Sequence, residues 1–341
     1  MTIPQYRASL FWASCFVAFA TLILIGAGGL VTSHNVGMSV PDWPTTYGYN
    51  MFFFPWSKMV GGILMEHSHR LIASGVGFLT IFLAIFITIK EKRSWIKKLA
   101  WLAVLLVVLQ GVLGGLRVVW MKDEIGIFHA CLAQSFLVLM SLLPLFFSRT
   151  WLDFSLEKPI AKSTFTLTAI TLGLIFLQLI LGAIMRHEHA DLAITDFPLA
   201  YGQVIPNLDE ARLNQINERR LQIQGLQPTD RFQIHLQLGH RGIAGLIFLG
   251  VISCWISLFR ERNFLRKWAT LWLCLVILQI ALGAWTIWSN KAADVATGHV
   301  IVGSLIFVTG SLLLALLWRA RVLARIQVEN SVPIELASSI V

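Results

Sequence analysis

Four histidines lie at matching places in the chain and are well suited to bind a metal. His69 and His240 stand at the mouths of two apolar segments, and an arginine follows each directly. His129 and His299 lie near the starts of two further apolar segments. An ionisable side chain is costly inside a membrane and requires a partner there. Two neutral imidazoles that face each other across a helical bundle suit the axial positions of a haem iron. The pattern therefore predicts two iron sites, one with His69 and His129 and one with His240 and His299.

The first of these sites also has an acidic residue. Glu66 precedes His69 by three positions, which places it one helical turn away on the same face. The corresponding residue before His240 is Gln237, which cannot change its charge. The asymmetry predicts a reactive site in the first half and an electron-transfer or structural haem in the second. The alternative for Glu66 is a hydrogen bond to a backbone group or to Arg70.

The arginines Arg70 and Arg241 follow their histidines directly and so point to another face of each helix. Near the outer surface they suit bidentate pairing with haem propionates. The alternative is that they extend to lipid phosphate. Three more histidines lie at the outer surface, where solvated or gating roles are expected and their function is left open: His34, His187 and His189.

The composition predicts a membrane protein. Of 341 residues, 56% are hydrophobic and 13% are charged, whereas soluble chains carry roughly 25% charged residues. The apolar runs predict eight transmembrane helices, at about 9–33, 60–89, 98–120, 125–147, 163–186, 232–259, 267–289 and 296–318. The first run is read as a retained helix, not a signal peptide. The four cysteines lie in apolar runs and are expected to be free, buried thiols.

Charge predicts the orientation of these helices. Lysine and arginine gather in the even-numbered connections and in the tails, for example at Lys90, Lys92 and Arg319. The positive-inside rule then places both termini in the cytoplasm and all four histidines toward the outer face. The net charge of +9 is thereby explained by topology, and nucleic-acid binding is not expected.

Two long loops fall on the outer side. We call residues 33–58 the first loop and residues 187–230 the second loop. Within the second loop, residues 207–220 have the spacing of a short amphipathic helix.

An internal repeat relates the two halves of the chain. Asp42-Trp43-Pro44 in the first loop matches Asp196-Phe197-Pro198 in the second. Gln110–Gly115 in the third predicted helix matches Gln279–Ala284 in the seventh. The predicted fold is an all-α polytopic membrane protein with two pseudo-symmetric four-helix bundles, 1–150 and 160–325, which are parallel repeats about an axis along the membrane normal.

The combined pattern resembles the haem A synthase family over nearly the whole chain. The residues that carry the resemblance are Glu66, His69, Arg70, His129, His240, Arg241, His299 and the two Asp-Trp/Phe-Pro segments. Members of this family oxidise the C8 methyl group of haem O to a formyl group, which gives haem A for terminal oxidases. The resemblance implies that His69 and His129 face haem O beside Glu66 as the reaction-supporting carboxylate, and that His240 and His299 hold haem b. Some members carry cysteine pairs in the outer loops, and this sequence has none there.

The resemblance also implies partners and a location. The expected partners are membrane lipid, the haem O synthase that supplies the substrate and an electron acceptor that the sequence does not identify. A homo-oligomer is a further possible assembly. The expected location is the bacterial cytoplasmic (inner) membrane, since no Arg-rich, Ser-rich leader precedes the first helix. Two other functions are weighed against haem A synthesis. A dihaem b-type cytochrome that exchanges electrons with quinone would place its haems across both leaflets, and a transporter would place its site near the midplane.

Overall fold

The computed structural model describes residues 6–122, 124–155, 160–260 and 264–331, with side chains up to residue 326. Within these residues, eight helices are long and apolar enough to span a membrane, which confirms the predicted all-α polytopic fold. They are α1 (Ala8–Ser33), α2 (Gly61–Lys90), α3 (Ser94–Val119), α4 (Glu124–Phe147), α6 (Lys162–His187), α8 (Arg231–Arg260), α9 (Leu265–Trp288) and α10 (Ala293–Ser331). Helix α10 continues past its predicted end at residue 318, where its last turns carry charged residues that follow the apolar run.

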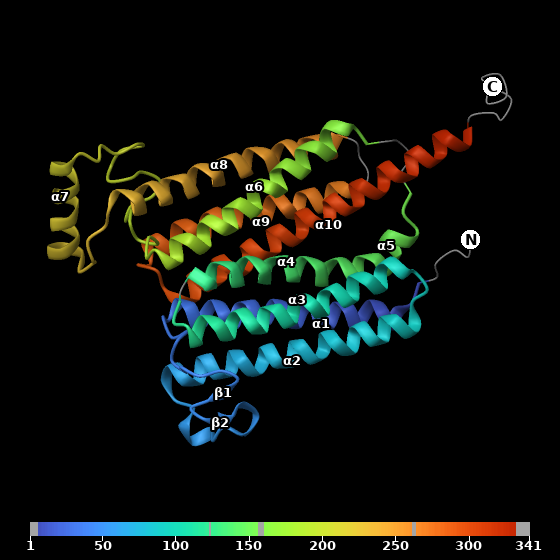
Figure 1. Cartoon of the computed structure of the whole chain (residues 1–341). Helices are drawn as coiled ribbons and strands as arrows, with labels where there is room; N and C mark the ends of the chain where they lie inside the picture. The colour runs from blue at the N-terminus through green and yellow to red at the C-terminus, as the bar shows by residue number, and fades with distance from the viewer. Residues whose placement is uncertain (1–5, 123, 156–159, 261–263, 332–341) are drawn as a thin grey trace, which may run out of the picture.

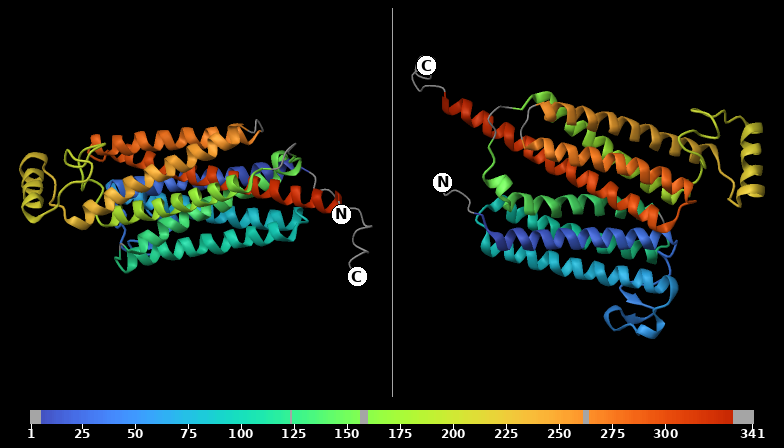
Figure 2. Two further views of the ribbon diagram at one scale, coloured as in Figure 1. Left: turned by 90° about the horizontal axis from the view of Figure 1, so that it is seen from above. Right: turned by 180° about the vertical axis from the view of Figure 1, so that it is seen from behind.

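The short elements gather mainly at one end of the bundle (Figure 1). They are β1 (Thr45–Thr46), β2 (Tyr49–Asn50), η1 (Met51–Phe53), η2 (Trp56–Lys58), α7 (Glu210–Arg219) and the π-helical turn η3 (Arg220–Gln224). Helix α1 begins and α10 ends at the opposite end, near the short helix α5 (Arg149–Leu152), and the view from behind agrees (Figure 2). We call the end with β1, β2 and α7 the loop end. The predicted helix within 207–220 is α7, whose first turn is capped by Asp209 accepting from the N–H of Arg212 at 2.8 Å.

Helices α4 and α10 form the centre of the bundle and contact each other. In their most apolar stretches 56% and 61% of the residues are buried, against 17–28% in the other six spans. The outer spans expose large apolar side chains such as Phe16 and Phe19, which suits helices that face lipid. The two halves are therefore joined through α4 and α10, together with contacts of α1 to α10 and of α4 to α6.

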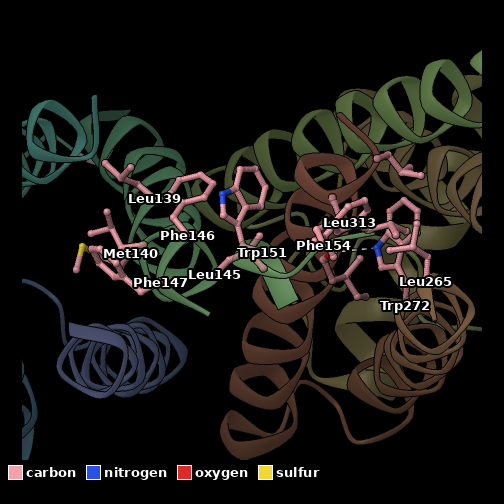
Figure 3. Packing of buried hydrophobic residues seen from close by; sticks show 14 of the residues in the cluster. Leu139, Met140, Leu145, Phe146, Phe147, Trp151, Phe154, Leu265, Trp272 and Leu313 are labelled. Carbon is pink, nitrogen blue, oxygen red and sulfur yellow. Dashed lines mark hydrogen bonds between the residues drawn. The ribbon is translucent and has the colours of Figure 1, made fainter. Parts of the chain in front are cut away.

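The apolar core is closely packed away from the loop end. Trp272 is fully buried, and its indole N–H donates to the backbone oxygen of Ile306 at 3.0 Å. A side chain at Gly310 would collide with this indole, since a Cβ there would lie 2.7 Å from it. Figure 3 shows Leu265, Trp272 and Leu313 packed together. The four cysteines are free, but Cys274 is exposed; the expectation that all four are buried is wrong because this side of α9 faces away from the core.

Candidate functional site

The four histidines of the predicted sites all lie near the loop end, because α2, α4, α8 and α10 begin there and each histidine falls within about ten residues of its helix start. His69 and His129 lie close enough to interact electrostatically. The same holds for His240 and His299. The structure thus brings together the pairs that the sequence predicts, one pair in each half.

Each imidazole packs against a glycine of a neighbouring helix. We measured the distance from the ring Cε1 atom to the position that a Cβ would take on that glycine. It is 3.0 Å for His69 and Gly28, 3.3 Å for His129 and Gly114, 3.5 Å for His240 and Gly182, and 3.1 Å for His299 and Gly283. At the tightest of these contacts a Cβ would push the ring by a few tenths of an ångström, so glycine is the residue that allows this close approach. The rings are therefore held against helix backbone, which fixes their position.

The four rings share one unpaired nitrogen. In all four histidines Nδ1 is buried, and within the described residues it has no hydrogen-bond partner. The Nε2 atoms of His69, His129 and His240 do not belong to this group of buried nitrogens without a partner. The three side chains are half-buried. His299 Nε2 lies 3.3 Å from the amide nitrogen of Gln279. Four imidazoles that each have a buried nitrogen without a hydrogen-bond partner are suited to bind a ligand, and their pairing fits axial ligation of two haem irons. The described residues hold no cluster of three or more metal-binding side chains.

Three glutamines support the histidine helices, and the sequence analysis did not assign them a role. Gln110 donates its amide N–H to the backbone oxygen of His129 at 3.0 Å, and Gln178 donates to that of His240 at 2.9 Å. Each of these glutamines lies four residues before the glycine that carries the ring, as Gln279 does before Gly283. The recurring Gln-x-x-x-Gly spacing could have identified them from the sequence.

Glu66 is almost completely buried, with 3% of its surface exposed. Its Oε2 accepts from the backbone N–H of Val40 at 2.8 Å, and its Oε1 accepts from the Arg70 guanidinium at 2.7 Å. The carboxylate thus holds the first loop to α2. Both alternatives considered for Glu66, a backbone hydrogen bond and a bond to Arg70, are present together.

Gln237 has the matching position in the second half. Its Oε1 accepts from the backbone N–H of Ile194 at 2.6 Å, and its Nε2 lies 3.3 Å from the backbone oxygen of Asp191. An uncharged amide therefore holds the second loop to α8 in the way that the Glu66 carboxylate holds the first. The bond to the loop N–H is shared, but the two side chains differ in charge and in their second partner, which is Arg70 for Glu66 and the backbone oxygen of Asp191 for Gln237.

The two loops share a turn that is longer than the predicted match. Asp42 accepts from the backbone N–H groups of Tyr47 and Gly48, and Asp196 accepts from those of Tyr201 and Gly202. In both turns the tyrosine and the glycine have positive φ angles. Partial burial raises the pKa of Asp42, but the hydrogen bonds from Gly48, Thr45 and Tyr47 outweigh it and leave the pKa below its usual value. Burial raises the pKa of Tyr201 to about 12.

Arg70 and Arg241 bind these loops. Arg70 donates to the backbone oxygens of Asp42 at 2.7 Å and Val40 at 2.7 Å. Arg241 donates to those of Leu199 at 2.9 Å and Asp196 at 2.8 Å. Their terminal nitrogens already have acceptors, so the propionate role stays a prediction.

The remaining histidines have different surroundings. His34 is exposed, and its Nδ1 bonds to the backbone oxygen of Leu30 at 2.9 Å at the end of α1. His187 lies against the start of α4, with its Cε1 2.5 Å from a Cβ position on Gly126. His189 is exposed in the second loop. None of the three joins a histidine pair in the described structure.

Comparison with known proteins supports one family. The family described as Cytochrome oxidase assembly protein matches residues 11–310. The chain is 26% identical to the Heme A synthase of Exiguobacterium sibiricum, over 85% of this chain and 89% of that protein. It is 26% identical to the Heme A synthase of Geobacillus kaustophilus, over 92% and 93%, and 28% identical to that of Shouchella clausii, over 85% and 91%. Since the matched region covers most of the sequence, the chain belongs to the cytochrome oxidase assembly protein family.

Proposed function

We propose that this protein is a haem A synthase, which oxidises the C8 methyl group of haem O to a formyl group through hydroxylated intermediates for the maturation of terminal oxidases. The observation that carries the proposal is the presence of two imidazole pairs at the loop end, each ring set on a glycine. The family match and the relatives named Heme A synthase agree with it.

The two pairs have different roles in this proposal. His69 and His129 position haem O as substrate in the first half, and His240 and His299 hold haem b in the second. The assignment is supported by the charge difference between Glu66 and Gln237, which make matching hydrogen bonds to their loops. At this matching position the first half has a carboxylate and the second half an amide, and only the carboxylate can accept protons that the reaction releases.

The chemistry requires a proton acceptor and an electron acceptor. Each oxidation stage removes a pair of electrons and their protons from the carbon, and water supplies the oxygen atom. His240 and His299 would hold haem b, which would supply electron transfer to an acceptor. Glu66 is held by Val40 and Arg70 in a buried position, where its negative charge stabilises an electron-poor methylene carbon or accepts a released proton. The glycines Gly28 and Gly114 keep the imidazoles fixed while this happens.

The location follows from topology and charge. We infer a bacterial cytoplasmic membrane, with the start of α1 and the end of α10 on the cytoplasmic side and the histidine pairs toward the outer face. Lys90 and Lys92 lie at the end of the bundle where α10 ends, which supports this orientation. Haem O reaches the site from lipid or from the haem O synthase.

Extraction of pigments from the purified protein tests the proposal. Haem b together with haem O or haem A supports a synthase. Haem b alone would favour a dihaem cytochrome, although all four histidines lie near one end of their helices and so at similar depth. Absence of any haem from protein purified in mild detergent would overturn the proposal and favour a transporter.

A further inference from the structure

The first loop carries a group of large apolar side chains that are exposed. They are Phe52, Phe53, Trp56 and Val60, and 81% of the surface of both Phe53 and Trp56 is exposed. We call these four residues the apolar tip. Scattered exposed apolar residues are common on proteins, but several large ones within a segment as short as 52–60 mark a surface that contacts another molecule.

The other face of this segment is buried against α2. Phe54 is buried and packs against the ring of His67, with 5.0 Å between the ring centroids. The Thr46 hydroxyl lies 3.0 Å from Nδ1 of the same histidine, which is itself buried. These contacts fix the orientation of the segment, so the apolar tip cannot rotate into the core without breaking them.

The segment lies beside the bundle and not beyond its end. Figures 1 and 2 show β1 and β2 on the flank of α2, level with its first turns, whereas α7 lies beyond the ends of the spans. The turn η1, which contains Phe52 and Phe53, contacts α2. Val60 directly precedes α2, and Leu64, one turn further on, is also exposed. The apolar tip is therefore continuous along the chain with the exposed apolar surface of α2.

Charge distinguishes this segment from the second loop. Between residues 43 and 65 the only charged side chain is Lys58. Residues 207–220, which include α7, contain six charged side chains: Asp209, Glu210, Arg212, Glu218, Arg219 and Arg220. A segment that lies in water is expected to have a charged surface, as α7 does, whereas each charge buried in lipid is costly. The composition of residues 43–65 therefore favours lipid over water.

The polar residues next to the tip are of the types found at the membrane surface. Tryptophan and tyrosine are enriched at the boundary between lipid and water, and lysine reaches the headgroups while its methylene chain lies along apolar surface. Lys58 donates from Nζ to the Tyr49 hydroxyl at 2.7 Å. A hollow of about 450 Å³ next to this pair is lined by Tyr47, Tyr49, Phe54, Lys58, Val60 and Ile63. An apolar hollow with one cation in its lining suits a phospholipid, whose chain is apolar and whose phosphate is anionic.

The second loop repeats the exposure of apolar residues at the matching place. Its turn is closed by a bridge between Ala200 and Gln203, as β1 and β2 close the turn of the first loop. Val204 and Ile205 follow directly, and both are exposed. Apolar side chains thus follow this turn in both halves of the chain, although the residue types differ.

We propose that the apolar tip is a membrane anchor, which lies in the lipid leaflet at the loop end with Tyr49 and Lys58 at the level of the phospholipid headgroups. This surface is outside the histidine sites, so the proposal does not depend on the proposed function. The first loop is then held at two points, by the bond from Val40 to Glu66 and by the contact of the tip with lipid.

Spin labels on engineered cysteines test the proposal, with the whole chain in vesicles of phosphatidylethanolamine and phosphatidylglycerol. The exposed Cys274 is first replaced by alanine. Collision of the label with oxygen, which concentrates in lipid, is compared with collision with a nickel chelate, which stays in water. We expect the oxygen-to-nickel ratio of Phe53→Cys to approach that of Phe82→Cys, an exposed site within α2, and to exceed severalfold that of Glu218→Cys, an exposed site on α7.

Two results would overturn the proposal. A ratio equal to that of Glu218→Cys would place the tip in water. Low collision with both reagents would show that protein covers the tip, so its partner would be a second copy of the chain and not lipid. Should Phe53→Cys fail to accumulate, Trp56→Cys replaces it, because the two side chains are equally exposed and the same ratios apply. Neither result bears on haem binding, which the extraction of pigments tests separately.

Discussion

Glu66 and Val40 are joined by a hydrogen bond of 2.8 Å from the backbone N–H of Val40 to the carboxylate. The acidic residue beside the first histidine pair is therefore also the anchor of the first loop. Gln237 makes the corresponding bond to Ile194 at 2.6 Å without a charge. Anchoring the loop therefore needs only a hydrogen-bond acceptor at this position, whereas the proposed chemistry at the haem needs an ionisable group.

The variant Glu66→Gln should keep the loop in place and lose the reaction. An amide at residue 66 can still accept from Val40, as Gln237 does from Ile194. We expect the content of both haems to match the wild type while conversion of haem O to haem A falls about a hundredfold or more, a size typical for loss of acid–base catalysis. Pigment analysis by chromatography measures both quantities. Unchanged conversion would remove Glu66 from the mechanism, and Glu66→Ala is the companion variant that should also loosen the loop.

The variant His240→Ala should abolish the low-spin haem b spectrum, because one axial ligand of the second site is lost. His235→Ala is the control on the same helix; His235 is exposed, and its ring bonds to the backbone oxygen of Arg231. The reduced-minus-oxidised optical spectrum of the purified protein checks the prediction. Survival of the low-spin band in His240→Ala would exclude this histidine as a ligand.

The variant Gly283→Ala should weaken haem binding in the second half without removing a ligand. A Cβ at this position would lie 3.1 Å from the His299 ring, so the imidazole must shift. Changes that reorient a ligand cost roughly 10- to 100-fold in affinity, and we expect a loss of that size for haem b. Gly239→Ala is the matched control, since a Cβ there meets nothing within 4 Å. Equal haem affinity in the two variants would show that the glycine contact does not position the ring.

The first loop should loosen in acid. The pKa of Asp42 is lowered in the fold, so the open loop binds the proton more tightly than the folded one does. The stabilisation is complete above the usual aspartate pKa of about 3.9 and is lost as pH falls through the lower folded value. Hydrogen exchange at Tyr47 and Gly48, corrected for intrinsic rates, should accelerate about tenfold or more between pH 5 and pH 3. In Asp42→Asn the protection should be weaker at pH 5 and independent of pH; a wild-type profile in this variant would assign the transition to another group.

The amino-acid sequence was enough to predict the spans and the ligand candidates. Long apolar runs predict transmembrane helices reliably because a bilayer leaves the backbone no other way to satisfy its hydrogen bonds. The helix starts of α2, α4, α8 and α10 place His69, His129, His240 and His299 at the loop end. Because these histidines are costly in lipid and recur in both halves, the sequence predicts them as ligands.

The hydrogen-bond partners of the polar groups depend on the tertiary structure. Spacing along α2 places Glu66 near His69, but it cannot show that both carboxylate oxygens are taken by Val40 and Arg70. Hydrogen-bond partners far apart in the sequence depend on the path of the loop, which periodicity does not encode. For the same reason the sequence could not predict the contact of each imidazole with a glycine on another helix, or the hydrogen bond from Arg186 on α6 to Ser33 on α1. The sequence names the groups that are costly to bury, and packing between distant segments determines which partner offsets that cost.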